Sequence, residues 1–149
     1  MSQLIFNSKR FEEATRKALG IFDRPLFQDD LKNVTKLDCS GFKFYSSDIG
    51  ILIKLSNLTE FILCTDKSDL KFLTPLSSLE RLFLEIDVTD WFLSFSDFKN
   101  LRALKYLHVI GAENSDFKIY SLEALKGLPN LKHIGLEFLK KSIWRLWKT

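Results

Sequence analysis

The stretch LKGLPNLKHIGL, which runs from Leu125 to Leu136, decides how this chain folds. Its apolar residues fall at Leu125, Leu128, Leu131, Ile134 and Leu136, in three steps of three and one step of two. A helix repeats every ~3.6 residues and a strand every ~2, so no single element has this rhythm. The fold therefore depends on whether the rhythm recurs elsewhere in the chain.

The rhythm occurs four times. With Leu131 taken as the reference position, the earlier copies place Leu104, Leu79 and Leu58 at the equivalent point. The positions of the pattern are apolar in all four copies, which comprise Ile49, Leu52, Leu55, Leu58, Phe61 and Leu63; Leu70, Leu73, Leu76, Leu79, Leu82 and Leu84; Phe95, Phe98, Leu101, Leu104, Leu107 and Val109; and Leu122, Leu125, Leu128, Leu131, Ile134 and Leu136. A partial fifth copy precedes them as Leu31, Val34, Leu37 and Cys39. Successive reference positions lie 21 to 27 residues apart, and a period in the twenties is typical of a solenoid.

Each copy has two physical parts. The last three apolar positions, such as Leu79, Leu82 and Leu84, end in an alternation that predicts a short strand with one face inward. The first three positions are spaced by three, which suits one or two turns of 3₁₀ or α helix. Residues that commonly cap helices stand just before these helical parts, at Asp48, Asp69, Ser94 and Ser121. The pattern predicts an α/β solenoid, with parallel strands on one face and short helices on the other.

Several segments resemble leucine-rich repeat proteins of the bacterial internalin-like type. The segments are NLTEFIL at 57–63, LTPLSSLERLFL at 73–84 and LEALKGLPNLKHIGL at 122–136. Residues 11–41 are similar to the helical cap and first repeat of such proteins. The resemblance implies a horseshoe with strands on its concave face, 3₁₀ helices on its convex face and a helical N-terminal cap. The family's asparagine after each strand is replaced here by Phe42, Asp66, Asp87, Ala112 and Leu139, so its asparagine ladder is not expected.

We expect a single domain over residues 1–149, with a cap at 1–30, about five repeats at 31–138 and a second cap at 139–149, because the apolar ends of a repeat stack must be covered. The first cap is predicted to hold a helix from Ser8 or Lys9 to Leu19, stopped by Gly20. The basic, tryptophan-containing segment 139–149 has a second interpretation as a membrane or partner anchor.

The composition limits the remaining possibilities. A formal charge of +3 on 149 residues is too small to indicate nucleic-acid binding by itself. No apolar run approaches the ~20 residues that span a bilayer, and the start MSQLIFNSKR does not resemble a secretory signal. We expect a cytoplasmic, monomeric protein without a cofactor or metal. Cys39 is expected to be buried and inert, whereas Cys64 is expected to point outward and be accessible.

The outward residues of the strands are the candidate binding site. They fall in three rows, which are Lys36, Glu60, Arg81, Tyr106 and His133; Asp38, Ile62, Phe83, His108 and Gly135; and Ser40, Cys64, Glu85, Ile110 and Glu137. Exposed apolar and aromatic side chains gathered in one patch favour binding of a protein partner. The predicted partner-binding residues are Glu60, Ile62, Arg81, Phe83, Glu85, Tyr106, His108 and His133, together with Trp91 in a loop at the rim. The alternative is that loops or caps cover this face.

We predict a non-catalytic protein-interaction module, and two other functions stay open. A compact domain of this kind also suits a bacterial immunity or inhibitor protein that neutralises a toxin. His108 and His133, with Glu85 or Glu137 nearby, suggest a metal-dependent or hydrolytic enzyme. The enzyme hypothesis is the weaker one, because the sequence has neither a glycine-rich phosphate loop nor a nucleophile elbow.

Overall fold

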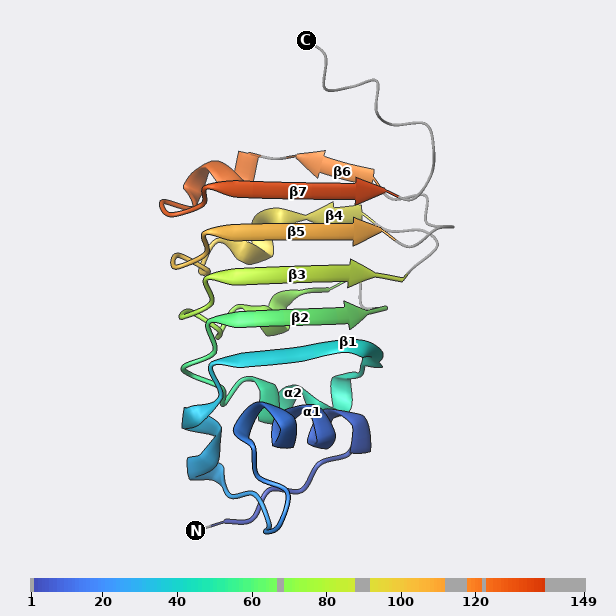
Figure 1. Cartoon of the computed structure of the whole chain (residues 1–149). Coiled ribbons are helices and arrows are strands. Elements are labelled where there is room, and N and C mark those ends of the chain that lie inside the picture. Colours follow the sequence, from blue (N-terminus) through green and yellow to red (C-terminus); the bar gives the residue numbers. More distant parts are fainter. Residues whose placement is uncertain (1, 67–68, 88–91, 112–117, 122, 139–149) are drawn as a thin grey trace.

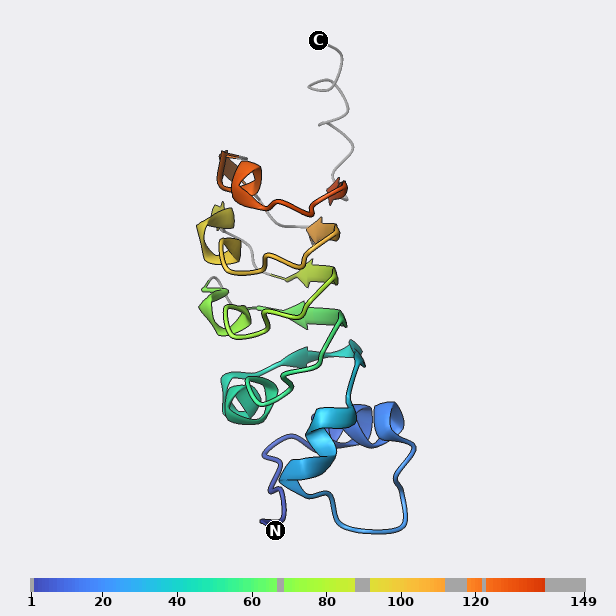
Figure 2. The ribbon, with the colours of Figure 1, turned by 90° about the vertical axis from the view of Figure 1, so that its left-hand side faces the viewer.

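The structure, a computed structural model, describes residues 2–66, 69–87, 92–111, 118–121 and 123–138 (Figure 1). Its main sheet is parallel and contains β1 (Lys36–Phe44), β2 (Glu60–Thr65), β3 (Arg81–Ile86), β5 (Tyr106–Gly111) and β7 (His133–Phe138), in that order. Short helices connect successive strands along the chain, and Figure 2 shows these helices stacked on one side of the sheet. The predicted solenoid with parallel strands is therefore confirmed.

The helical elements are short, apart from the first. They comprise α1 (Lys9–Leu19), α2 (Ile49–Leu52) and 3₁₀ helices at Gln28–Asn33, Ser46–Asp48, Lys71–Leu73, Phe95–Phe98 and Glu123–Gly127. The three-residue spacing of the pattern produces these 3₁₀ turns, because residues i and i+3 of a 3₁₀ helix lie on the same side. That side faces the sheet, and Leu73, Phe98 and Leu125 are buried on it.

The repeat keeps its register from coil to coil. Phe61 pairs with Leu82, Leu82 with Leu107, and Leu107 with Ile134. The reference residues Val34, Leu58, Leu79 and Leu104 are all 0 % exposed and share one apolar core. Exposure rises at the last coil, where Ile134 is 45 % exposed.

Backbone hydrogen bonds join every coil to the next at the start of its strand. The carbonyl of Thr35 accepts from the N–H groups of both Thr59 and Glu60, at 2.8 and 3.0 Å. The carbonyls of Thr59, Glu80 and Lys105, each one residue after a reference position, do the same for the coils that follow. Each coil therefore satisfies its polar backbone on its neighbour.

A side-chain ladder runs beside these backbone bonds. The Nδ2 of Asn57 donates to the carbonyl of Lys32 at 2.8 Å, and Ser78 Oγ donates to the carbonyl of Ser56 at 2.9 Å. The Nδ2 of Asn130 donates to the carbonyl of Arg102 at 2.8 Å. Each donor residue lies one position before the reference residue of its own coil. Each acceptor residue lies two positions before the reference residue of the preceding coil. The ladder thus sits at the start of the strands.

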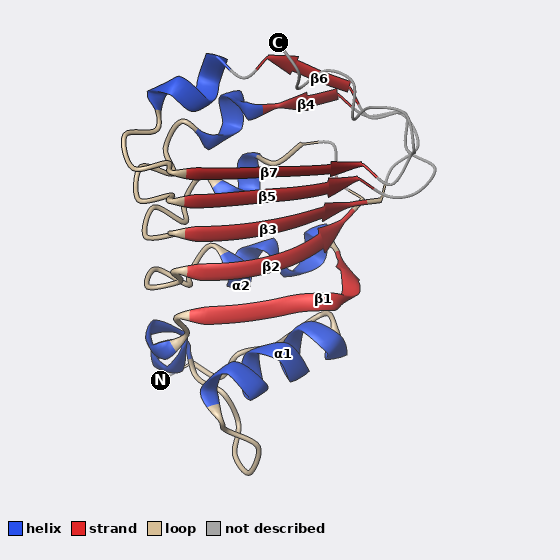
Figure 3. Cartoon of the chain, turned by 45° about the horizontal axis from the view of Figure 1, so that its top comes forward, coloured by secondary structure: helices blue, strands red, loops and turns tan. Residues whose placement is uncertain are grey.

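The N-terminal cap has the predicted helix. Ser8 is the N-cap of α1 and its Oγ accepts from the N–H of Phe11, while Gly20 ends the helix in the left-handed region at φ 68°. The helix lies beside β1 (Figure 3), and Phe11 is 0 % exposed there with its ring 5.3 Å from that of Phe44. Aromatic packing thus joins the cap to the first coil.

Asp48 also ties the cap to the first coil. It is 0 % exposed, and its Oδ1 accepts from the N–H groups of Asn7 and Ser8 at 3.1 and 3.3 Å. Asp48 stands at the N-cap of α2 as the sequence predicts, but its side chain makes no capping bond to that helix. Asp69 does accept from the N–H of Lys71 at 2.9 Å, at the start of the next helical turn.

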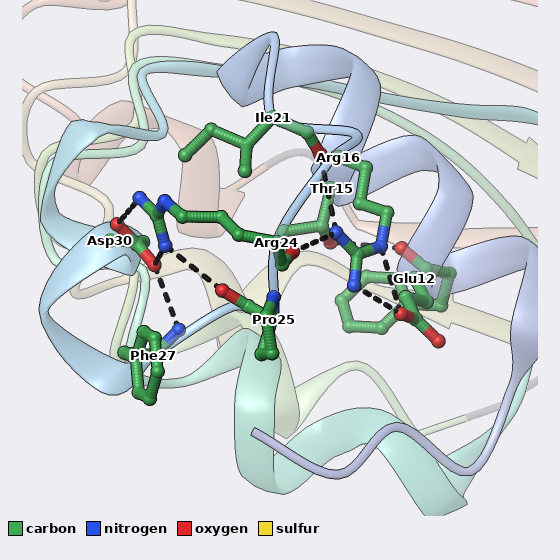
Figure 4. Close-up of polar contacts among 9 residues, drawn as sticks. Glu12, Thr15, Arg16, Ile21, Arg24, Pro25, Phe27 and Asp30 are labelled. Carbon is green, nitrogen blue, oxygen red and sulfur yellow. Dashed lines mark hydrogen bonds and ion pairs between the residues drawn. The ribbon is translucent and has the colours of Figure 1, made fainter. Parts of the chain in front are cut away.

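An ion pair fixes the loop between α1 and the first coil (Figure 4). Arg24 donates from both terminal nitrogens to Asp30, at 2.7 and 2.9 Å, and Asp30 also accepts from the N–H of Phe27. These bonds, above all those from Arg24, hold the pKa of Asp30 at about 2. A bidentate pair of this kind sets the direction in which the chain leaves the cap.

The structure adds one element that the sequence pattern does not show. Residues of the longer connections form a second, two-stranded parallel sheet from β4 (Phe92–Ser94) and β6 (Lys118–Ser121), which is drawn above β7 in Figure 3. The strands have three and four residues, too few for a sequence period to reveal.

The side-chain ladder predicts which substitutions change stability. Asn57→Ala removes one donor and should lower the free energy of unfolding by about 0.5–1.5 kcal/mol. Ala103 occupies the equivalent position, one residue before the reference residue Leu104, but its side chain has no donor. Ala103→Asn should therefore raise the free energy of unfolding by a similar amount, because the new amide can donate to the carbonyl of Ser77. Urea denaturation measures both changes.

Asn33→Ala is the matched control for the ladder. Asn33 also lies one residue before a reference residue, Val34. The cap, and not another coil, precedes it, and its side chain makes no hydrogen bond to another described residue. Its replacement should change stability by no more than about 0.5 kcal/mol. An equal loss for Asn33→Ala and Asn57→Ala would contradict the ladder.

The Arg24–Asp30 pair predicts a pH effect. The Asp30 pKa is lower in the folded chain than the ~3.9 of an unfolded one, so its stabilisation is present above about pH 4 and is lost as pH falls through about 2. Asp30→Asn should therefore destabilise the protein at pH 7, and the difference from wild type should shrink between pH 4 and pH 2. Urea titrations across this range measure it. Asp29→Asn, at the exposed neighbouring residue, is the control and should change stability little at pH 4 or at pH 2. A stability difference between wild type and Asp30→Asn that stays constant from pH 4 to pH 2 would show that the ion pair does not cause the effect.

Candidate functional site

The face of the main sheet that points away from the short helices is called the open face here. It corresponds to the face that the sequence predicts as concave. Strand register places the first predicted row side by side, since Lys36 pairs with Glu60, Glu60 with Arg81, Arg81 with Tyr106 and Tyr106 with His133. It does the same for the second row, which contains Asp38, Ile62, Phe83, His108 and Gly135. All these residues are exposed or half-buried, so no described part of the chain covers them.

Three planar groups stack along the first row. The guanidinium carbon of Arg81 lies 4.3 Å from the ring centre of Tyr106. The ring of His133 lies on the other neighbouring strand, 4.7 Å from the ring of Tyr106 and within 1° of parallel to it. A cation over an aromatic face contributes about 0.5–1 kcal/mol at an exposed site. The stack therefore holds long side chains in place before any partner arrives.

The second row contains a shorter stack. The rings of Phe83 and His108 are 5.8 Å apart and inclined by 29°. His108 leans over Gly135, where an added Cβ would lie 3.2 Å from the imidazole ring. Its Nε2 is 3.1 Å from a carboxylate oxygen of Glu137, although it has no hydrogen bond of good geometry among the described residues. The absence of a side chain at Gly135 thus lets His108 reach across the last strand.

The third row is only partly as predicted. Cys64 pairs with Glu85, Glu85 with Ile110, and Ile110 with Glu137, as expected. The neighbour of Cys64 on β1 is Lys43 instead of Ser40, because β1 bulges between Cys39 and Lys43. Gly41 lies within this bulge and is the sequence signal for it, since glycine inside a strand often marks one.

The bulge also changes the environment of Cys64. Lys43 on β1 forms an ion pair with Asp87, which directly follows β3. The pair therefore spans β2, the strand between them, where Cys64 is the neighbour of Lys43. Cys64 is 8 % exposed, so the prediction of an accessible thiol is wrong. Lys43 is a residue of the open face that the strict alternation of strand residues does not reveal.

Both cysteines are buried and free. Burial raises the pKa of the Cys39 thiol to about 12, and the carboxylates of Asp38 and Asp48 raise it further. Burial also raises the pKa of Cys64, assisted by Glu85. The expectation that Cys39 is buried is confirmed, and neither thiol has the lowered pKa of a reactive cysteine.

The two histidines proposed for an enzyme or metal site do not form a pair across the strands. His108 pairs with Gly135, and His133 pairs with Tyr106, so they sit on different rows. Within the part of the chain that the structure describes, no three His, Cys, Asp or Glu side chains gather as a metal site would require. What the geometry offers instead is a patch of stacked rings and apolar side chains flanked by charges.

Two predictions fall on residues outside the described ranges. Trp91, predicted as a contact in the rim loop, is one of them, and the segment 139–149 is the other. Among the helices of the described residues, none is long and apolar enough to cross a membrane.

Comparisons with known proteins bear on the fold. Neither protein-family models nor curated proteins match the sequence. Among solved structures, an internalin (inlF) from Listeria monocytogenes is similar, with a TM-score of 0.63 and 22 % identity, over 93 % of this chain and 46 % of that one. The fold is a leucine-rich repeat solenoid. It is similar to the fold of this internalin, and the chain spans less than half the length of that internalin. An internalin C2 (inlC2) from the same species also aligns, with a TM-score of 0.41 and 16 % identity, over 95 % of this chain and 92 % of that one.

The thiol environments give a prediction for both cysteines. Reaction with a disulfide reagent at pH 8 needs a thiolate, and a pKa near 12 leaves on the order of a thousandfold less thiolate at Cys39 than in an unfolded chain. We expect no fast-reacting thiol in the native protein and two in urea. Single Cys39→Ser and Cys64→Ser variants show which cysteine gives each slow phase of the reaction. A rapid phase in the native protein that disappears in Cys64→Ser would show that the Cys64 thiol is accessible after all.

Proposed function

We propose that this leucine-rich repeat chain is a non-catalytic protein-interaction module that binds a protein partner on its open face. The observation that carries the proposal is the stacked arrangement of Arg81, Tyr106 and His133 beside Phe83 and His108. Three adjacent strands supply these side chains, and no described residue covers them. Tyrosine and arginine are among the residues that contribute most to protein interfaces.

Preorganisation supports the same proposal. Binding normally costs about 0.5–1.5 kcal/mol for each long side chain that it immobilises. Here the stacks already restrict Arg81 and Tyr106, and the backbone beneath them is a hydrogen-bonded sheet. Less conformational entropy is therefore lost when a partner binds these side chains than if the same side chains stood on a loop.

The proposed contact residues keep the set that the sequence indicates. They are Glu60, Ile62, Arg81, Phe83, Glu85, Tyr106, His108 and His133, and Trp91 is added as a contact from the rim. A catalytic role is not part of the proposal, because the stacks engage both imidazoles with neighbouring rings.

The proposal extends to domain organisation and location. Ile134 is 45 % exposed in the last described coil, which supports a role for residues 139–149 as the C-terminal cap of a single domain. Two buried, unpaired cysteines suit the reducing conditions of the cytoplasm.

The test compares two double variants in a pull-down from the native lysate. Phe83→Glu with Tyr106→Glu places two charges in the centre of the open face and should reduce capture of the partner at least tenfold. Phe22→Glu with Tyr45→Glu is the matched control, since these aromatic residues are 71 % and 54 % exposed and lie outside the sheet. The control should capture as much partner as the wild type does.

Circular dichroism must show that both variants fold before capture is compared. If the folded open-face variant retains the partner as well as the control does, the binding site lies elsewhere.

A further inference from the structure

The charge of the open face opposes that of the whole chain. The chain has a formal charge of +3. Among the described residues, the open face and the carboxyl ends of its strands are acidic, with cations at Lys36, Lys43 and Arg81 against carboxylates at Asp38, Glu60, Asp66, Glu85, Asp87 and Glu137. Such a separation of charge is a property of the fold, because it arises only when distant residues are brought to one face.

The cations of this face are already engaged. Lys36 lies 3.6 Å from Glu60, and Lys43 is paired with Asp87. Arg81 is stacked on Tyr106. The positive charges of the face are thus compensated locally or held against a ring.

Two carboxylates stay available. Glu85 is exposed, and its side chain makes no ion pair or hydrogen bond to another described residue. Glu137 is 56 % exposed and meets only the imidazole of His108 among the described side chains. They lie in the third row on either side of Ile110, so their Cα atoms are roughly 10 Å apart at ~4.8 Å per strand.

An apolar surface lies between and beside these carboxylates. Ile62, Phe83 and Ile110 are half-buried, and Phe83 is stacked with His108. A guest that suits both the apolar floor and the acidic flanks has an apolar stem and a cationic head. Arginine and lysine side chains have this construction, since their methylene stems lie along apolar surface while the charge stays at the tip.

Arginine fits this surface better than lysine does. Its planar guanidinium stacks on rings and binds carboxylates through two parallel hydrogen bonds. The open face already stacks one guanidinium on a ring, because Arg81 lies 4.3 Å from the ring centre of Tyr106 on the neighbouring strand.

We propose that Ile62, Phe83, Ile110, Glu85 and Glu137 form an acidic arginine-binding patch, and that the protein partner presents an arginine side chain to it. This inference rests on the proposed function, since it assigns the chemistry of the partner at the same face. Nucleic acids and phosphorylated or acidic peptides are disfavoured there, because their charge has the same sign as the patch.

The direct test uses short peptides and the full chain labelled with ¹⁵N. The probe is acetyl-Leu-Arg-Leu-amide, and the control peptides replace arginine by citrulline, which has the same shape without the charge, or by glutamate. The arginine peptide should shift the amide resonances of Phe83, Glu85 and Ile110, with at least tenfold weaker binding for citrulline and none for glutamate. Equal binding of the three peptides, or no shift at millimolar arginine peptide, overturns the proposal.

Charge-neutral variants locate the effect. Glu85→Gln with Glu137→Gln should weaken binding of the arginine peptide about tenfold or more and reduce its dependence on salt. Glu13→Gln with Asp29→Asn removes the same charge from exposed sites in the N-terminal cap and should leave binding unchanged. Equal weakening by both pairs would mean a general charge effect and would overturn the patch.

The pull-down separates this inference from the proposed function. A partner that is lost with Phe83→Glu and Tyr106→Glu but is retained at wild-type affinity with Glu85→Gln and Glu137→Gln overturns the arginine patch alone. A partner retained by both pairs overturns the open face as the binding site. Loss with both pairs, together with selective binding of the arginine peptide, supports the two proposals.

Discussion

The structure depends on the contact between one coil and the next at the start of each strand. A single coil of this chain cannot bury its leucines or satisfy its backbone alone. At this point the reference residues Leu58, Leu79 and Leu104 are fully buried, and one carbonyl per coil accepts two N–H groups from the coil that follows. Apolar burial and backbone pairing are thus met by the same neighbour, which makes the relative position of successive coils strongly determined.

That constraint is also what builds the candidate site. A shift of one residue in any strand would turn its outward side chains toward the core, so the core leucines fix which side chains face outward. Because the same register holds from β2 to β7, side chains about 25 residues apart in sequence become direct neighbours. The Arg81–Tyr106–His133 stack is a consequence of this alignment, with a planar group supplied by each of three strands.

The N-terminal cap solves a different problem with different interactions. It covers the apolar end of the first coil by packing Phe11 against Phe44 of β1, and its direction is set by polar bonds to Asp48 and by the Arg24–Asp30 pair. The cap therefore holds the first strand in place without joining the sheet through a strand of its own. The bulge of β1 lies at this boundary, where the regular repeat begins, and it is there that Lys43 enters the open face.

The sequence by itself determined the solenoid, the register, the cap helix and the membership of the first two rows, because each follows from a short period of apolar residues or from local capping. The tertiary structure alone decided the β1 bulge, the burial of Cys64, the Lys43–Asp87 pair, the β4–β6 sheet and the stacking of the rings. These features depend on side-chain direction and on contacts between coils. Periodicity states which residues share a face, but it does not contain the rotamers and local irregularities that decide what those residues touch.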